Sequence, residues 1–161
     1  MPYAHSGSVR IHYRVEGEGP ALVLQHGFNE SVVDWYEAGY VDALRPVYRL
    51  ILIDARRHGA SDKPHDPDAY LLNRRVSAVI AVLDALEIAK ASYWGYSMGG
   101  WIGFGIAKYA KERIRALVIG GQHPYPRSMG ALRQMVQRGI EQGSGAFVAA
   151  MEEMFGPASS T

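Results

Sequence analysis

Gly95-Tyr96-Ser97-Met98-Gly99 stands between a short apolar run, residues 91–94, and a glycine-rich run with helical spacing, residues 100–107. This G-x-S-x-G pattern in this setting predicts a nucleophile elbow, a sharp strand-to-helix turn that carries the serine. Such a turn strains the backbone, and the flanking glycines leave room for it. The helix that follows directs its N-terminus at Ser97, so that the Met98 N–H can stabilise a developing oxyanion.

Predicted strands and helices alternate around this elbow. Strands are predicted at residues 9–15, 21–25, 48–53, 91–94 and 115–120, and helices at 32–44, at 72–86 and from the elbow to about residue 111. The run 21–25 is apolar almost throughout, as in a central strand that is covered on both faces. The alternation predicts an α/β fold with a mostly parallel sheet and helices on both faces.

Composition indicates one ordinary globular domain. The chain has 161 residues, 48% of them hydrophobic and 20% charged, with a formal net charge of +1 and no cysteine. Because Lys and Arg do not form a long run, nucleic acid is not an expected partner. No stretch approaches the roughly 20 apolar residues that span a bilayer, so no membrane partner is expected either. We expect a cytoplasmic protein with no cofactor. No metal is expected either, since His5, His65 and Asp66 do not form a convincing ligand set.

Two further stretches, taken with the elbow, resemble the α/β-hydrolase family. Gln25-His26-Gly27-Phe28 is similar to the H-G turn after the family's third strand. The loop 54–64 is similar to the family's D-x-R-G-x-G-x-S-x-x-P loop, with Arg57 where glycine is usual. The resemblance covers residues 8 to about 124. It implies the N-terminal part of an α/β-hydrolase core over residues 1–126, without the family's last strands, and the start of a helical cap or lid over residues 127–161.

The resemblance also assigns roles to particular residues. It implies that Ser97 is the nucleophile and that the N–H groups of Phe28 and Met98 form the oxyanion hole. A serine at the elbow favours acyl-enzyme chemistry over that of the family's aspartate-nucleophile members. In open α/β sheets the ligand binds at the carboxyl ends of the strands. We therefore expect Gly27, Trp35 and His123 to line a substrate pocket, although tryptophan at such a position is more often part of the core.

These roles predict a serine hydrolase that acts on carboxylic esters or lactones. The Met and Phe residues of the predicted cap favour an apolar acyl or alcohol group in the substrate. C–C bond hydrolysis and cofactor-free perhydrolysis are alternatives, because Ser97-Met98-Gly99-Gly100 resembles both groups. An alternative of another class is a catalytically incomplete fragment that binds or associates.

A base and an acid for Ser97 are not evident in the sequence. The family order is Ser, then Asp or Glu, then His, and His123 is the only histidine after Ser97. Three interpretations stay open. The base and acid come from a missing C-terminal half or from a second copy of the chain, His123 is recruited as the base, or the domain is a shortened one. An apolar edge strand at 117–119 would leave backbone groups unpaired, which favours the first.

The remaining polar residues of the matched motifs are expected to have structural roles. His26 is expected to hold the H-G turn through hydrogen bonds. Asp54 is expected to cap its own loop and to pair with Arg56 or Arg57. His58 and His65 lie in polar stretches and are expected to be solvated.

Overall fold

The computed structural model describes residues 2–124 and, beyond them, only residues 134, 137–138, 141–143, 145–146 and 148–149. The chain divides into two compact units, Met1–Pro124 and Tyr125–Thr161. The helices predicted after residue 127 fall mostly outside the described residues, so the cap remains a prediction.

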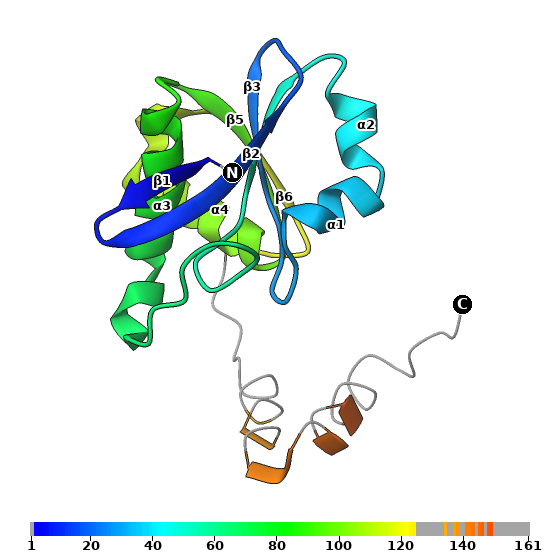
Figure 1. Ribbon diagram of the computed structural model, residues 1–161, viewed down its shortest axis with the longest axis vertical. Helices are drawn as coiled ribbons and strands as arrows, with labels where there is room; N and C mark the ends of the chain where they lie inside the picture. Colours follow the sequence, from blue (N-terminus) through cyan, green and yellow to red (C-terminus); the bar gives the residue numbers. More distant parts are fainter. Residues whose placement is uncertain are drawn as a thin grey trace. The chain divides into compact units, whose positions relative to one another are not determined.

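The first unit is built on a six-stranded sheet in the order β1-β2-β4-β3-β5-β6 (Figure 1). The strands are β1 (Tyr3–Ser6), β2 (Val9–Glu16), β3 (Ala21–Gln25), β4 (Arg49–Ile53), β5 (Ala91–Tyr96) and β6 (Ile114–Gly120). The strands β3, β4, β5 and β6 run parallel, whereas β1 and β2 pair antiparallel. The mostly parallel sheet is confirmed. The short strand β1 escaped prediction because its four residues carry no clear alternation.

Helices cover both faces of this sheet, as predicted. They are α1 (Val32–Glu37), α2 (Tyr40–Leu44), α3 (Leu72–Ala85) and α4 (Met98–Tyr109), with short 3-10 turns η1 (Pro67–Tyr70) and η2 (Lys111–Arg113). The single helix predicted over 32–44 is wrong. It divides at Gly39, whose φ of 77° is a left-handed conformation that interrupts a helix and that glycine adopts readily.

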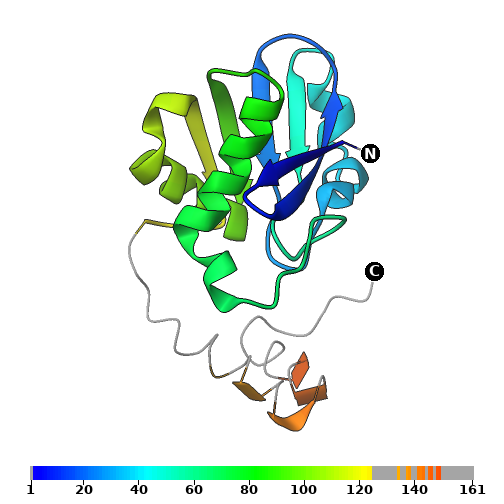
Figure 2. The ribbon, with the colours of Figure 1, turned by 60° about the vertical axis from the view of Figure 1, so that its left-hand side comes forward.

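The two faces of the sheet bury separate apolar clusters, because side chains alternate along each strand. One cluster joins the sheet to α1 and α2 and contains Leu22, Leu24, Leu50, Leu52 and Trp35. The other joins it to α3 and α4 and contains Val23, Ile51, Ile53, Tyr93 and Ile102. Figure 1 shows α1 and α2 on one side of the sheet and α3 and α4 on the other, and Figure 2 shows α3 crossing in front of it.

Asp54, at the carboxyl end of β4, is a buried link between several elements. Its Oδ2 atom lies 2.7 Å from Nδ1 of His12 on β2. The same carboxylate accepts the Val32 N–H at the start of α1, at 2.8 Å, and the Ala60 N–H of its own loop, at 2.9 Å. Asp54 therefore links β2, β4, α1 and its own loop at the carboxyl ends of the parallel strands, where β3 and β5 also end.

The expected pairing of Asp54 with Arg56 or Arg57 is wrong. The Arg56 side chain is buried and turns away, with Nη2 donating to the backbone oxygen and the hydroxyl of Ser6 at 3.2 and 2.7 Å. Arg57 has a φ of 76°, so the backbone shape for which the family ordinarily uses glycine is kept here by a strained arginine. Its side chain is exposed.

Asp54→Ala should lower the free energy of unfolding by about 3–5 kcal/mol, because it leaves a buried histidine, the buried Val32 N–H and the partly buried Ala60 N–H without their acceptor. Urea unfolding measures the loss. Asp42→Ala is the matched control, since Asp42 forms an exposed pair with Arg45 and its side chain is 76% exposed. That control should change stability by less than about 1 kcal/mol. Equal losses in the two variants would contradict the linking role of Asp54.

Candidate active site

Ser97 joins the end of β5 to the start of α4. Its φ of 50° and ψ of −110° are strained for a residue other than glycine. The Ser97 N–H donates to the Gly120 carbonyl of β6 at 2.8 Å, and the Ser97 carbonyl accepts the Trp101 N–H at 3.1 Å. The strand-to-helix turn expected at Ser97 is therefore present, and it is held from both sides by backbone hydrogen bonds.

Two glycines allow this turn to pack against its neighbours. A Cβ atom at Gly95 would lie 2.2 Å from the Gly99 carbonyl oxygen, and one at Gly99 would lie 2.1 Å from the Gln25 carbonyl oxygen. The fully buried Tyr93 adds a hydroxyl that donates to the Gly99 carbonyl at 2.8 Å. The first turn of α4 thus packs, backbone to backbone, against the end of β3.

The H-G turn follows directly from that end of β3. It carries the Phe28 N–H, while α4 begins with the Met98 N–H. Within the described part of the chain, neither N–H donates to an acceptor, and the Ser97 hydroxyl has no hydrogen-bond partner. Backbone N–H groups of this kind, one of them at a helix N-terminus, are suited to stabilise negative charge that develops on an oxygen.

His26 holds the H-G turn, as expected. Its Nε2 atom accepts the Ala55 N–H at 3.0 Å, so the ring proton resides on Nδ1 and is donated to the Gly27 carbonyl at 2.7 Å. Burial is the main cause that lowers the pKa of His26. The ring is therefore a neutral structural group with both nitrogens engaged.

His58 is not solvated, and that expectation is wrong. The residue is 7% exposed, and its ring centroid lies 5.2 Å from that of His26 and 5.7 Å from that of Phe28. Its polar loop folds inward because the buried Ser61 hydroxyl donates to the Asp54 carbonyl. His58 therefore packs behind the residue that supplies one of the two candidate oxyanion donors. The polar sequence around His58 gave no indication that its side chain is buried.

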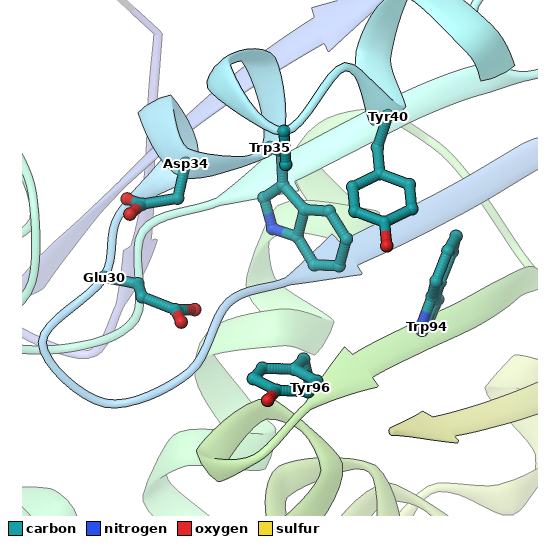
Figure 3. Close-up of a pocket in the computed structure, with 7 residues that line it drawn as sticks. Glu30, Asp34, Trp35, Tyr40, Trp94 and Tyr96 are labelled. Atoms are coloured by element: carbon teal, nitrogen blue, oxygen red, sulfur yellow. The ribbon is translucent and has the colours of Figure 1, made fainter. Parts of the chain in front are cut away.

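A cavity of about 310 Å³ opens beside the elbow on the α1 side of the sheet (Figure 3). Its walls come from the segment that leads into α1, from α1 and α2, and from β5: Glu30, Asp34, Trp35, Ala38, Tyr40, Trp94 and Tyr96. Trp35, which is 6% exposed, is both a core residue and a wall, and its buried Nε1 has no acceptor among the described residues. Glu30 connects the cavity to the H-G turn, because its Oε2 accepts the Gly27 N–H at 2.6 Å.

The other two expected pocket residues lie outside this cavity wall. Gly27 belongs to the H-G turn, and His123 follows β6 as a half-buried residue whose N–H donates to the Gln122 side chain. Among the described residues, no histidine hydrogen-bonds to Ser97. The structure thus places the serine and two amide donors without a described acceptor at the carboxyl ends of β3 and β5, and the roles of all the predicted site residues remain predictions.

The described residues contain no group of three or more His, Cys, Asp or Glu side chains arranged to hold a metal ion. None of their helices has the length and apolar character needed to cross a membrane.

The parallel sheet, the strained serine and the free amide donors define the class of hydrolases built around a nucleophile elbow. The chain belongs to the α/β-hydrolase-fold family, whose model matches residues 20–151.

Relatives and solved structures of this family match most of the chain. A protein of Bacillus subtilis (strain 168), named provisionally as a 2-succinyl-6-hydroxy-2,4-cyclohexadiene-1-carboxylate synthase, is 34% identical over 89% of this chain and 56% of its own length. The enol-lactonase from Burkholderia xenovorans LB400 has a TM-score of 0.79 and 28% identity, over 93% of this chain and 58% of that one. The esterase RhEst1 from Rhodococcus sp. ECU1013 has a TM-score of 0.76 and 29% identity, over 95% and 59%.

Other matched relatives carry the name epoxide hydrolase. The chain spans 56% of the Bacillus protein and 20% to 48% of the next relatives in order of similarity. A general hydrolase-family assignment follows from these matches, but a particular substrate does not.

Gly99→Ala should disrupt the elbow, because its Cβ would meet the Gln25 carbonyl oxygen at 2.1 Å and backbone atoms cannot swing aside. We expect a loss of about 2 kcal/mol or more in the free energy of unfolding. Urea unfolding tests this. Gly145→Ala is the control, since no atom of the described residues lies within 4 Å of its added Cβ. A Gly99→Ala protein as stable as the control would show that the backbone contact is not as close as described.

Stability should fall as the pH drops below about 6.5, the unfolded-state pKa of histidine, because the folded protein holds the pKa of His26 below that value. Below that pH the His26 ring binds a proton in the unfolded chain but remains neutral in the folded chain. One such histidine adds a slope of up to about 1.4 kcal/mol per pH unit. Unfolding free energies at pH 7.5 and pH 5 measure it.

His26→Gln should reduce this pH dependence while also lowering stability at pH 7.5, where the hydrogen bonds of His26 are lost. His5→Gln, at an exposed position, is the control. An unchanged pH dependence in His26→Gln would argue against a neutral buried ring.

Proposed function

We propose that this chain carries the nucleophilic half of a serine hydrolase that acts on carboxylic esters or lactones. The observation that carries the proposal is the strained Ser97 on its strand-to-helix turn. The Phe28 and Met98 N–H groups lie at the same carboxyl ends of the parallel strands and have no acceptor in the described part of the chain. The Ser97 oxygen attacks the carbonyl carbon and loses its proton to a base. The carbonyl oxygen becomes an oxyanion that the N–H groups of Phe28 and Met98 stabilise.

The rest of the reaction follows from this first adduct. The tetrahedral adduct collapses, the alkoxide leaves with a proton from the base, and an acyl ester remains on Ser97. Water then gives a proton to the base and attacks the acyl ester. The acyl group leaves as a carboxylic acid, and the serine oxygen takes the proton back from the base. Matched structures named as a lactonase and an esterase support ester and lactone substrates.

A base and an acid must reach Ser97 for this chemistry, and we propose that they come from outside the chain. The supplier would be a C-terminal half, such as the portion of the matched structures that this chain does not cover, or a second copy of the chain. The position of β6 at the edge of the sheet supports this proposal. Val118 on β6 is 51% exposed, and Tyr96 beside the elbow is 48% exposed. Within the described residues β6 pairs only with β5, and an apolar strand edge of this kind is a ready surface for another polypeptide.

Labelling with a fluorophosphonate probe, followed by mass spectrometry, tests the nucleophile. We expect slow labelling of the chain at Ser97 and an increase of about tenfold or more when imidazole is added as an external base, because general-base catalysis is worth 10²–10⁴-fold. Ser97→Ala should remove the label. Ser92→Ala, on the same strand, should retain it.

His123→Ala distinguishes the two sources of a base. If the base is external, this variant is labelled at the wild-type rate both with and without imidazole. A loss of labelling in His123→Ala alone would assign the base to His123. No labelling of Ser97 even with imidazole would overturn the proposed function.

A further inference from the structure

Arg75, in the first turn of α3, extends its side chain toward the elbow. Its Nε donates to the Tyr70 carbonyl at 3.0 Å, and its Nη1 lies 3.3 Å from the Met98 sulfur. The guanidinium also lies over the Tyr70 ring, 5.4 Å from its centroid. The positive charge of Arg75 thus contacts the side chain of the residue that follows Ser97.

This charge has no counter-ion in the described part of the chain. No carboxylate pairs with Arg75, Nη2 has no acceptor there, and a thioether sulfur is only a weak acceptor. Burial is the main cause that lowers the pKa of Arg75, and the charge of Arg56 lowers it further. Arg56 is itself 4% exposed, has no carboxylate partner among the described residues, and leaves its Nε without an acceptor. Partly buried cations are costly without an anion nearby.

The opposite side of the elbow has the opposite charge. Met98 packs with the apolar cluster on the α3 and α4 face of the sheet, whereas the cavity of Figure 3 lies on the α1 face. Glu30 and Asp34 line that cavity, and its wall contains no basic side chain. An anionic group is therefore repelled from the cavity side and attracted to the Arg75 side.

We propose that Arg75 binds a carboxylate of the substrate, so that the substrate is an ester or lactone bearing an anionic group beyond its scissile carbonyl. The planar guanidinium has N–H groups left for a two-point contact with a carboxylate. This substrate class rests on the proposed hydrolysis at Ser97. The product of such a hydrolysis is a dicarboxylate, with one end at Arg75 and the new carboxylate at the Phe28 and Met98 N–H groups.

Binding of glutarate to the full chain, compared with its neutral isostere glutaramide, tests the proposal without requiring turnover. Isothermal titration at low ionic strength should give a dissociation constant for glutarate in the millimolar range, with glutaramide at least about tenfold weaker. Arg75→Gln should weaken glutarate binding by about tenfold or more. Arg74→Gln is the matched control, because it removes the same charge from an exposed neighbour on the same helix and should change binding by less than about twofold.

Arg75→Lys guards against a folding defect in the glutamine variant. Lysine keeps the positive charge but lacks the planar guanidinium with its paired N–H donors, so the glutarate affinity of this variant should lie between those of wild type and Arg75→Gln. Glutarate binding that is equal in wild type and Arg75→Gln, equal to glutaramide binding, or absent at about 100 mM would overturn the proposal. Failure of the proposed function would appear separately, as an unlabelled Ser97 in a chain that still binds glutarate.

Discussion

The contact between the first turn of α4 and the end of β3 is the constraint on which the site depends. No side chain fits between Gly99 and the Gln25 carbonyl, so the backbone of the first turn of α4 lies directly against the backbone at the end of β3. This closeness brings the Phe28 and Met98 N–H groups to the same edge of the sheet as Ser97. The fully buried Tyr93 hydroxyl holds the Gly99 carbonyl from within the sheet, so the elbow is fixed by packing as well as by its own strained dihedral angles.

A second set of interactions fixes the H-G turn from the side of β4. Asp54 joins β2 to the start of α1, and His26 ties the Gly27 carbonyl to the Ala55 N–H. His58 then packs against both His26 and Phe28. Three buried histidines and one carboxylate thus hold the elements around this backbone turn in place. This rigidity suits the proposed oxyanion role, because an N–H group stabilises charge without reorganisation only if its direction is fixed beforehand.

Structural features with a local sequence signature were predicted, whereas contacts between residues far apart in the sequence were missed. Apolar runs and the G-x-S-x-G pattern located the central strands and Ser97, because strand burial and a tight turn impose local residue choices. The partner of Asp54 could not be predicted, since His12 is 42 residues away and is brought near only by sheet pairing. His58 lies in a polar stretch and Arg75 on the predicted helix 72–86, and only the folded chain shows that His58 is buried and that Arg75 contacts Met98.

The use of backbone donors has a consequence for protein engineering. The Phe28 side chain is 60% exposed, and its contribution to the site would come from the peptide group rather than the ring. Under the proposed function, a mutational library could vary codon 28 among side chains that still pack on His58, proline excepted, and sample new substrate shapes while the N–H donor is kept. Codons 95 and 99 offer no such freedom, because a Cβ atom at either position would meet backbone atoms at 2.2 and 2.1 Å.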